Sequence, residues 1–69
     1  MIAKHSVTLH GHRTSFSLEE EFFAALKTMA TEKDLSLAEL IAGIDDERRD
    51  GENLSSALRI RVLDWALGR

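Results

Sequence analysis

The sequence predicts a mainly α-helical chain with one β-strand, which pairs with a second copy to form an intertwined dimer. Three observations predict this fold class. A short alternating segment, residues 13–18, precedes two amphipathic helices, each of which opens with a capping signal. One strand and two helices cannot close a core alone, because a lone strand leaves both of its edges unpaired. The 69 residues include no cysteine, so disulfides and thiolate metal sites are excluded and oligomerisation remains as the support for so small a domain.

The N-terminal segment, residues 1–11, is predicted to be an arm that is separate from the pairing strand. Leu9 is apolar at an odd position, whereas Phe16 and Leu18 are apolar at even positions. Side chains alternate between the two faces of a strand, so the buried face must change between these residues. Gly11 lies in that interval, and it predicts a bulge or a bend there.

Residues 12–45 are predicted to form the core unit of strand, helix and helix. Ser17 and Glu20 fit a capping box, so the first helix is expected to begin after Ser17. The apolar stripe of this helix follows helical spacing and consists of Phe22, Leu26, Met29 and Ala30. Phe23 lies beside the stripe and is expected to meet the other subunit. Asp34 is expected to close the helix in the left-handed conformation.

A second capping box, in which Ser36 is the N-cap and Glu39 the third helical residue, announces the second helix. The apolar stripe of this helix consists of Leu37, Leu40, Ile41 and Ile44. Residues 46–52 are charged and contain an Asp-Gly turn signal, so they predict a linker. A loose calcium-type cluster is the alternative for the carboxylates of this region, although they lack the ligand spacing of an EF-hand loop.

Residues 53–69 predict a third helix, from about Leu54 to Leu67, with Asn53 or Ser55 as its cap. The helix carries two apolar stripes: one consists of Leu54, Leu58, Val62, Trp65 and Ala66, and the other of Ile60, Leu63 and Leu67. A helix that is apolar on two sides needs two neighbours. One neighbour is expected to come from a second subunit, with Trp65 in the core of the dimer.

Charge is distributed unevenly along the chain. Residues 1–18 contain Lys4 and Arg13 and no Asp or Glu, whereas residues 19–69 hold all twelve acids against seven bases. The local charges of +2 and −5 together give the net charge of −3. A positive ribbon on an acidic body still binds phosphate locally, because exposed charges more than about 8 Å apart are largely screened at physiological salt. Chance is the other explanation for an excess of two charges.

The sequence does not support an enzyme or a membrane protein. It has no cysteine nucleophile, no Gly-rich phosphate loop, and no serine that a known motif places beside a base. No apolar run approaches the roughly 18 residues of a membrane span, and the N-terminus lacks the core of a signal peptide. A soluble cytoplasmic protein without a cofactor is therefore expected.

The segment Arg13–Leu18 (RTSFSL), the helix that follows it and the serine-capped second helix together resemble the ribbon-helix-helix family of DNA-binding proteins. The resemblance covers Arg13–Ile44, a little under half of the chain. The stretch GHRTS before an LEEEFF-type helix is similar to a bacterial subgroup with a C-terminal helical extension. The resemblance implies a homodimer whose two strands form an antiparallel ribbon in the major groove of duplex DNA, and hence a small transcriptional regulator.

The resemblance implies three residues that face the bases, namely Arg13, Ser15 and Ser17, while Thr14, Phe16 and Leu18 face the helices. Arg13 suits guanine, because its guanidinium can bond O6 and N7 together. The alternative for Arg13 is a solvated charge or an ion pair with a partner's glutamate. Ser15 and Ser17 discriminate little between bases, and Ser17 is also the expected helix cap.

Other candidate contacts lie outside the strand. The amino end of the second helix, around Ser36 and Leu37, is implied to hold a DNA phosphate, which the helix dipole and the free amides favour. Lys4 and His12 are candidate contacts from the N-terminal side of the strand. His10 and His12 are alternatively metal ligands, for which the sequence identifies no third or fourth ligand, or ordinary surface histidines.

Two classes of function follow. In the first, the chain is a DNA-binding regulator, such as an antitoxin-like protein. In the second, it is a non-DNA interaction module in which the ribbon serves dimerisation only, while the arm and the third helix bind another protein, such as a toxin-like partner. The acid-free ribbon favours the first class, and the net acidity and the short serine side chains favour the second.

Overall fold

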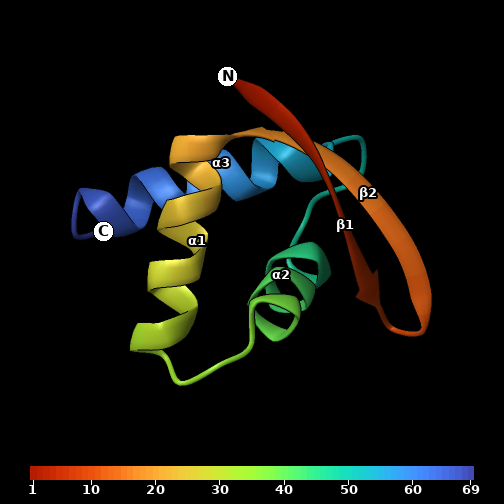
Figure 1. The fold of residues 1–69 in the computed structure, drawn as a ribbon, viewed down its shortest axis with the longest axis horizontal. Coiled ribbons are helices and arrows are strands. Elements are labelled where there is room, and N and C mark those ends of the chain that lie inside the picture. Colours follow the sequence, from red (N-terminus) through yellow and green to blue (C-terminus); the bar gives the residue numbers. More distant parts are fainter.

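In the computed structural model, which describes residues 1–69, a two-stranded antiparallel hairpin is covered on one face by three helices (Figure 1). The elements, in chain order, are β1 (Ile2–Leu9), β2 (His12–Glu19), α1 (Glu20–Glu32), α2 (Leu37–Asp46) and α3 (Leu54–Ala66). None of the three helices is long and apolar enough to cross a membrane.

The N-terminal segment is a strand, so the prediction of one strand per chain with a separate arm is wrong. β1 pairs with β2 along its whole length, and His10 and Gly11 form the turn between them with φ values of 51° and 81°. Two positive φ angles in a two-residue loop are typical of a type I′ turn. The inward-facing residues have odd numbers before Gly11 and even numbers after it. This switch reflects the register of a hairpin rather than a bulge, because odd positions of β1 lie opposite even positions of β2 on the same face.

The hairpin also corrects the predicted start of the first helix. α1 begins at Glu20, its N-cap is Glu19, and the predicted capping box at Ser17 does not form. The physical reason is the ladder with β1, which continues to the Glu20 N–H group, a donor to the Met1 carbonyl at 3.1 Å. Pairing of this kind holds residues 17–19 extended, and the turn that a serine cap requires is lost.

The other predicted helix ends are confirmed. Asp34 closes α1 with a φ of 57°. At the start of α2 the Glu39 N–H group donates to the Ser36 hydroxyl at 3.0 Å, and the Ser36 N–H group donates to the Glu39 carboxylate at 2.8 Å, which completes the capping box. The N-cap of α3 is Asn53, whose side chain accepts from the Ser56 N–H group at 2.8 Å.

The hydrophobic core lies between the inner face of the hairpin and the helices. It consists of 13 buried residues: Leu9, Phe16, Leu18, Leu26, Met29, Ala30, Leu40, Ile41, Ile44, Leu54, Ala57, Leu58 and Val62. The predicted stripes of α1 and α2 contribute to it, together with one stripe of α3. A single chain therefore encloses a core that the sequence predicted would need a second copy, because β1 adds the second strand of the covering sheet.

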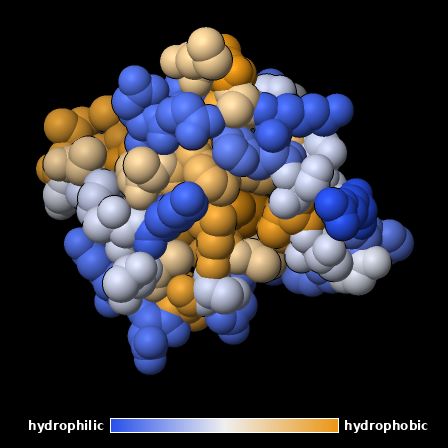
Figure 2. All heavy atoms as spheres, viewed as in Figure 1, coloured by the Kyte–Doolittle hydropathy of each residue, from blue (hydrophilic) through white to orange (hydrophobic).

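The second apolar stripe of α3 remains at the surface. Ile60, Leu63 and Leu67 are 52%, 49% and 58% exposed, whereas Leu58 on the other side of the helix is fully buried. Figure 2 shows apolar atoms at the end of the molecule that carries the C-terminal half of α3, on the left of the view. The neighbour that the sequence predicted for this stripe is not supplied by the chain itself.

Two aromatic side chains that were predicted to meet a second subunit have neighbours within the chain. Phe23 stacks on His5, with 3.7 Å between the ring centroids and 6° between the ring planes. The indole N–H of Trp65 donates to the Glu32 carboxylate at 3.0 Å. Both side chains are partly buried and pack against the core, so each has an intramolecular role.

Candidate nucleic-acid interface

The outer face of the hairpin, defined as the face turned away from the helices, carries three pairs of polar residues. The pairs are Thr8 opposite Arg13, Ser6 opposite Ser15, and Lys4 opposite Ser17. All six side chains are exposed. The array contains two cations, four hydroxyl groups and no carboxylate, so it can donate hydrogen bonds to phosphate oxygens and to base edges.

The β2 half of this face agrees with the sequence analysis. Arg13, Ser15 and Ser17 lie on the outer face, while Phe16 and Leu18 are buried beneath it. Because Ser17 is not a helix cap, its exposed hydroxyl is available for an external partner. These placements are confirmed, and the DNA-contact roles of the three residues remain predictions.

The β1 half was only partly predicted. Lys4 was a candidate, but Ser6 and Thr8 were not, and the register of the hairpin brings them opposite Ser15 and Arg13. The Ser6 and Ser15 hydroxyl oxygens lie 3.4 Å apart. The regular recurrence of polar residues at positions 4, 6 and 8 was visible in the sequence. It acquires meaning only once β1 is known to pair with β2.

Glu19 lies at the end of the outer face, opposite Ile2, and a cation from α3 compensates its charge. The Arg59 Nε–H group donates to the Glu19 carboxylate at 2.9 Å. This hydrogen bond, followed by one from the backbone, lowers the pKa of Glu19 below its usual value. The carboxylate at the edge of the face is therefore ionised and paired at neutral pH, and Lys4 and Arg13 remain as the unpaired charges of the array.

Ser36 and Leu37 belong to the helical layer, at the start of α2, and not to the outer face. The capping box engages both the hydroxyl and the amide of Ser36, which leaves the amides of Leu37 and Ala38 free. The hydrogen bond from the Ser36 backbone, followed by the one with its hydroxyl, lowers the pKa of Glu39. An anion at this helix end would therefore lie close to an ionised carboxylate.

Acid is expected to remove the stability that Glu39 contributes through this capping box. A lowered folded-state pKa means that the contribution is present above the ordinary Glu value of 4.5 and is lost as the pH falls through the folded-state value. Glu39→Gln should therefore lose less free energy of unfolding than the wild type between about pH 6 and about pH 3. Urea unfolding followed by circular dichroism measures the difference. Glu21→Gln, at an exposed carboxylate in the first turn of α1, is the control for the loss of one charge. Equal acid loss in the wild type and Glu39→Gln would contradict the prediction.

The histidines of the hairpin lie apart from the polar array. The His10 Nε2 atom lies 2.7 Å from the Asp46 carboxylate, which ties the turn to the end of α2. His12 is exposed, but strand alternation places it on the side of Thr14 and Phe16 rather than on the outer face. No group of three or more His, Asp or Glu side chains in the structure is placed to hold a metal ion.

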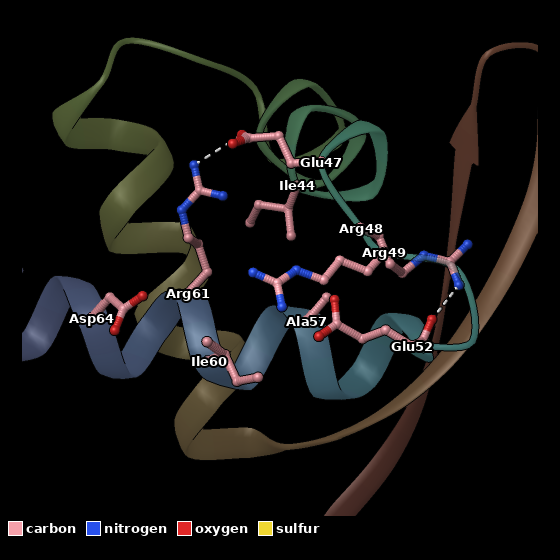
Figure 3. Close-up of a pocket in the computed structure, with 9 residues that line it drawn as sticks. All are labelled: Ile44, Glu47, Arg48, Arg49, Glu52, Ala57, Ile60, Arg61 and Asp64. Atoms are coloured by element: carbon pink, nitrogen blue, oxygen red, sulfur yellow. Dashed lines mark hydrogen bonds and ion pairs between the residues drawn. The ribbon is translucent and has the colours of Figure 1, made fainter.

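A hollow of about 550 Å³ lies between the end of α2 and α3 and has mixed charge (Figure 3). The charged residues that line it are Arg48, Arg49, Arg61, Glu47, Glu52 and Asp64. Two of the arginines point to neighbouring oxygens: Arg61 is 3.1 Å from the Glu47 carboxylate, and Arg48 donates to the Glu52 carbonyl at 2.7 Å. Because its cations and carboxylates are equal in number, this hollow lacks the positive excess of the outer face.

Comparison with known proteins gives one match. A family model described as a ribbon-helix-helix domain matches residues 2–66. The match runs from the start of β1 to the end of α3, so the first strand and the third helix both lie within the matched unit. No match was found among curated proteins or among solved structures.

Proposed function

Because this chain belongs to the ribbon-helix-helix domain family, we propose that it is a dimeric DNA-binding protein that acts as a small transcriptional regulator. DNA binding is the general property of this family. The observation that carries the proposal is the array of three polar pairs on the outer face of the hairpin, which exposes two cations and four hydroxyl groups on a chain with a net charge of −3, while the carboxylate at its end, Glu19, is paired with Arg59. Concentration of the positive charge on one face suits a polyanion that approaches from that side.

The proposed dimer forms through the edge of β2 that β1 leaves free. Along an antiparallel strand, successive residues direct their backbone N–H and C=O groups alternately toward the partner strand and away from it. The hydrogen bond from Glu20 to Met1 shows that the even-numbered residues of β2 bond to β1, so the backbone groups of Arg13, Ser15 and Ser17 point away from β1. A second β2 strand would satisfy these groups, except the Ser17 carbonyl, which already accepts a hydrogen bond from Ser55. The sheet of the dimer then has the order β1-β2-β2-β1, and the helices of both copies cover the same face.

A hollow beside this edge supports the pairing. It measures about 420 Å³ and lies between β2 and the first turn of α3, with Lys4, Ser15, Phe16, Ser17, Asn53, Leu54 and Ser55 as its lining. The Ser55 hydroxyl donates to the Ser17 carbonyl at 2.7 Å, which marks the end of the free segment of β2. The incoming strand would fill the hollow and leave α3 at the end of the ribbon.

In the proposed complex the two central β2 strands enter the major groove, which admits a two-stranded ribbon. Arg13 contacts guanine with two hydrogen bonds, and the Ser15 and Ser17 hydroxyls contact either kind of base. The amides that follow Ser36, beginning with Leu37, hold a phosphate beside the groove.

Binding of duplex DNA by the intact chain tests the proposal. Fluorescence anisotropy with a labelled mixed-sequence duplex should show an affinity that falls steeply with salt, by about 0.9 log units per tenfold rise in salt for each phosphate contacted. Light scattering on the protein without DNA should give the mass of a dimer. If the protein shows no affinity for the duplex at low salt, the proposed function is wrong.

A second candidate is a non-DNA interaction module in which the hairpin serves dimerisation only. The observation that favours it is the exposed apolar stripe of α3, formed by Ile60, Leu63 and Leu67. The same anisotropy experiment separates the two candidates, because an interaction module of this kind gives no binding of duplex DNA that depends on the outer face of the hairpin.

A further inference from the structure

We propose that β1 is the phosphate-binding strand of this protein, with Lys4, Ser6 and Thr8 in contact with the two sugar-phosphate backbones that border the major groove. The inference rests on the proposed DNA-binding function and deepens it. In the proposed dimer, the two β2 strands form the central part of the outer face and contact bases. The two β1 strands flank them and contact the sugar-phosphate backbones of the DNA.

The width of the sheet places β1 over the rim of the groove. Neighbouring strands lie about 4.8 Å apart, so the outer strands of a four-stranded sheet are roughly 14 Å apart. The major groove is about 12 Å wide and accommodates only two strands. With both β2 strands in the groove, the two β1 strands lie above its edges, where the phosphates are.

The chemistry of the two strands matches this division. The β1 residues of the outer face, Lys4, Ser6 and Thr8, offer an amine and two hydroxyl groups, which donate to phosphate without distinguishing one base from another. Arg13, on β2, is the residue of the array whose rigid planar fork best matches two acceptors of a base, whereas the ammonium group of Lys4 is a compact charge on a flexible stem. The register brings Thr8 opposite Arg13, so a phosphate contact and a base contact lie side by side.

Electrostatics also favours β1 over the start of α2 as the principal phosphate contact. The capping box at Ser36 holds the Glu39 carboxylate beside the free amides of α2, where it repels a phosphate. On the outer face the nearest carboxylate, Glu19, is paired with Arg59. Lys4 is exposed and lies directly opposite Ser17, and its diagonal neighbour across the ladder, Glu19, is the carboxylate that Arg59 pairs.

Lys4→Gln tests the assignment, with Lys27→Gln as the matched control. Both lysines are exposed, and Lys27 lies within α1, in the helical layer rather than on the outer face of the hairpin. Loss of one phosphate contact per chain should weaken binding by about 30-fold at physiological salt and reduce the salt slope of the dimer by about 2. The factor should be the same for a mixed-sequence duplex and for a duplex selected by the wild type from a random pool. Ser6→Ala combined with Thr8→Val should weaken binding to both duplexes alike, with a smaller change in slope.

Each result has a distinct consequence. Equal effects of Lys4→Gln and Lys27→Gln would overturn the assignment, because the loss would then reflect net charge alone. A change in sequence preference in Lys4→Gln would also overturn it, since β1 would then contact bases. Absence of binding by the wild type would overturn the proposed function itself. Binding by the wild type that Lys4→Gln leaves unchanged would overturn only the role of β1. Circular dichroism of both variants confirms that the exposed substitutions leave the fold intact.

Discussion

Arg13→Ala is expected to weaken binding of the proposed dimer to its preferred duplex by at least about 25-fold, while the mass of the protein in solution stays the same. The side chain is exposed on the outer face, so its removal leaves the core intact. A bidentate contact between arginine and guanine is worth about 1–3 kcal/mol, and a dimer makes two, so the total loss is about 2–6 kcal/mol. Every 1.4 kcal/mol corresponds to about tenfold in affinity, so a loss of about 2 kcal/mol gives the lower limit of about 25-fold.

The decisive measurement for Arg13 is sequence preference rather than affinity alone. A duplex selected by the wild type from a random pool should lose its advantage over a mixed-sequence duplex when Arg13 is replaced. Arg49→Ala removes an exposed arginine from the loop after α2 and is the control for charge. If Arg13→Ala kept the wild-type preference, the assignment of Arg13 as the base contact would be wrong, even if the affinity fell.

The features that the sequence predicted well are those that depend on a few neighbouring residues. The capping box between Ser36 and Glu39 involves residues three positions apart, and it forms as expected. The left-handed Asp34 at the end of α1 is equally local, because it is followed by a hydrogen bond from Leu35 to Ala30 at 2.9 Å, which completes the turn. The apolar stripes of the helices were visible for the same reason.

The hairpin was missed because its turn lacks the usual signal. Type I′ turns favour Asn-Gly or Asp-Gly, whereas this chain uses His10-Gly11. Histidine is among the non-glycine residues that adopt positive φ more often than most, and its contact with Asp46 anchors the turn. The switch of the apolar positions from odd numbers at Leu9 to even numbers at Phe16 is what a two-residue hairpin produces, but a bulge explains the same pattern.

The predicted cap at Ser17 shows how a long-range contact overrides a local one. The residues fit a capping box, but pairing with β1 keeps them extended, and the helix begins at Glu20 instead. The same limit applies to the candidate site. Arg59 compensates Glu19 although the two residues are forty positions apart, and nothing near either residue in the sequence indicates their contact.

Leu58→Ala is expected to destabilise the chain by about 2–5 kcal/mol, which is the usual cost of a large cavity in a core. Leu58 is fully buried in α3. A domain of 69 residues has a free energy of unfolding of roughly 3–10 kcal/mol, so this substitution is expected to remove a large part of it. Urea unfolding followed by circular dichroism measures the loss. Wild-type stability in Leu58→Ala would mean that α3 does not pack on the core as described.

Leu63→Ala is the matched control, because it makes the same chemical change on the same helix at a side chain that is 49% exposed. Within a single chain it should cost less than about 1 kcal/mol. The sequence nevertheless predicts a second neighbour for the stripe that contains Leu63. If a second copy covers that stripe, Leu63→Ala should approach the cost of Leu58→Ala and weaken the dependence of stability on protein concentration. A small cost at every concentration would instead leave the stripe outside the dimer interface, free for another protein.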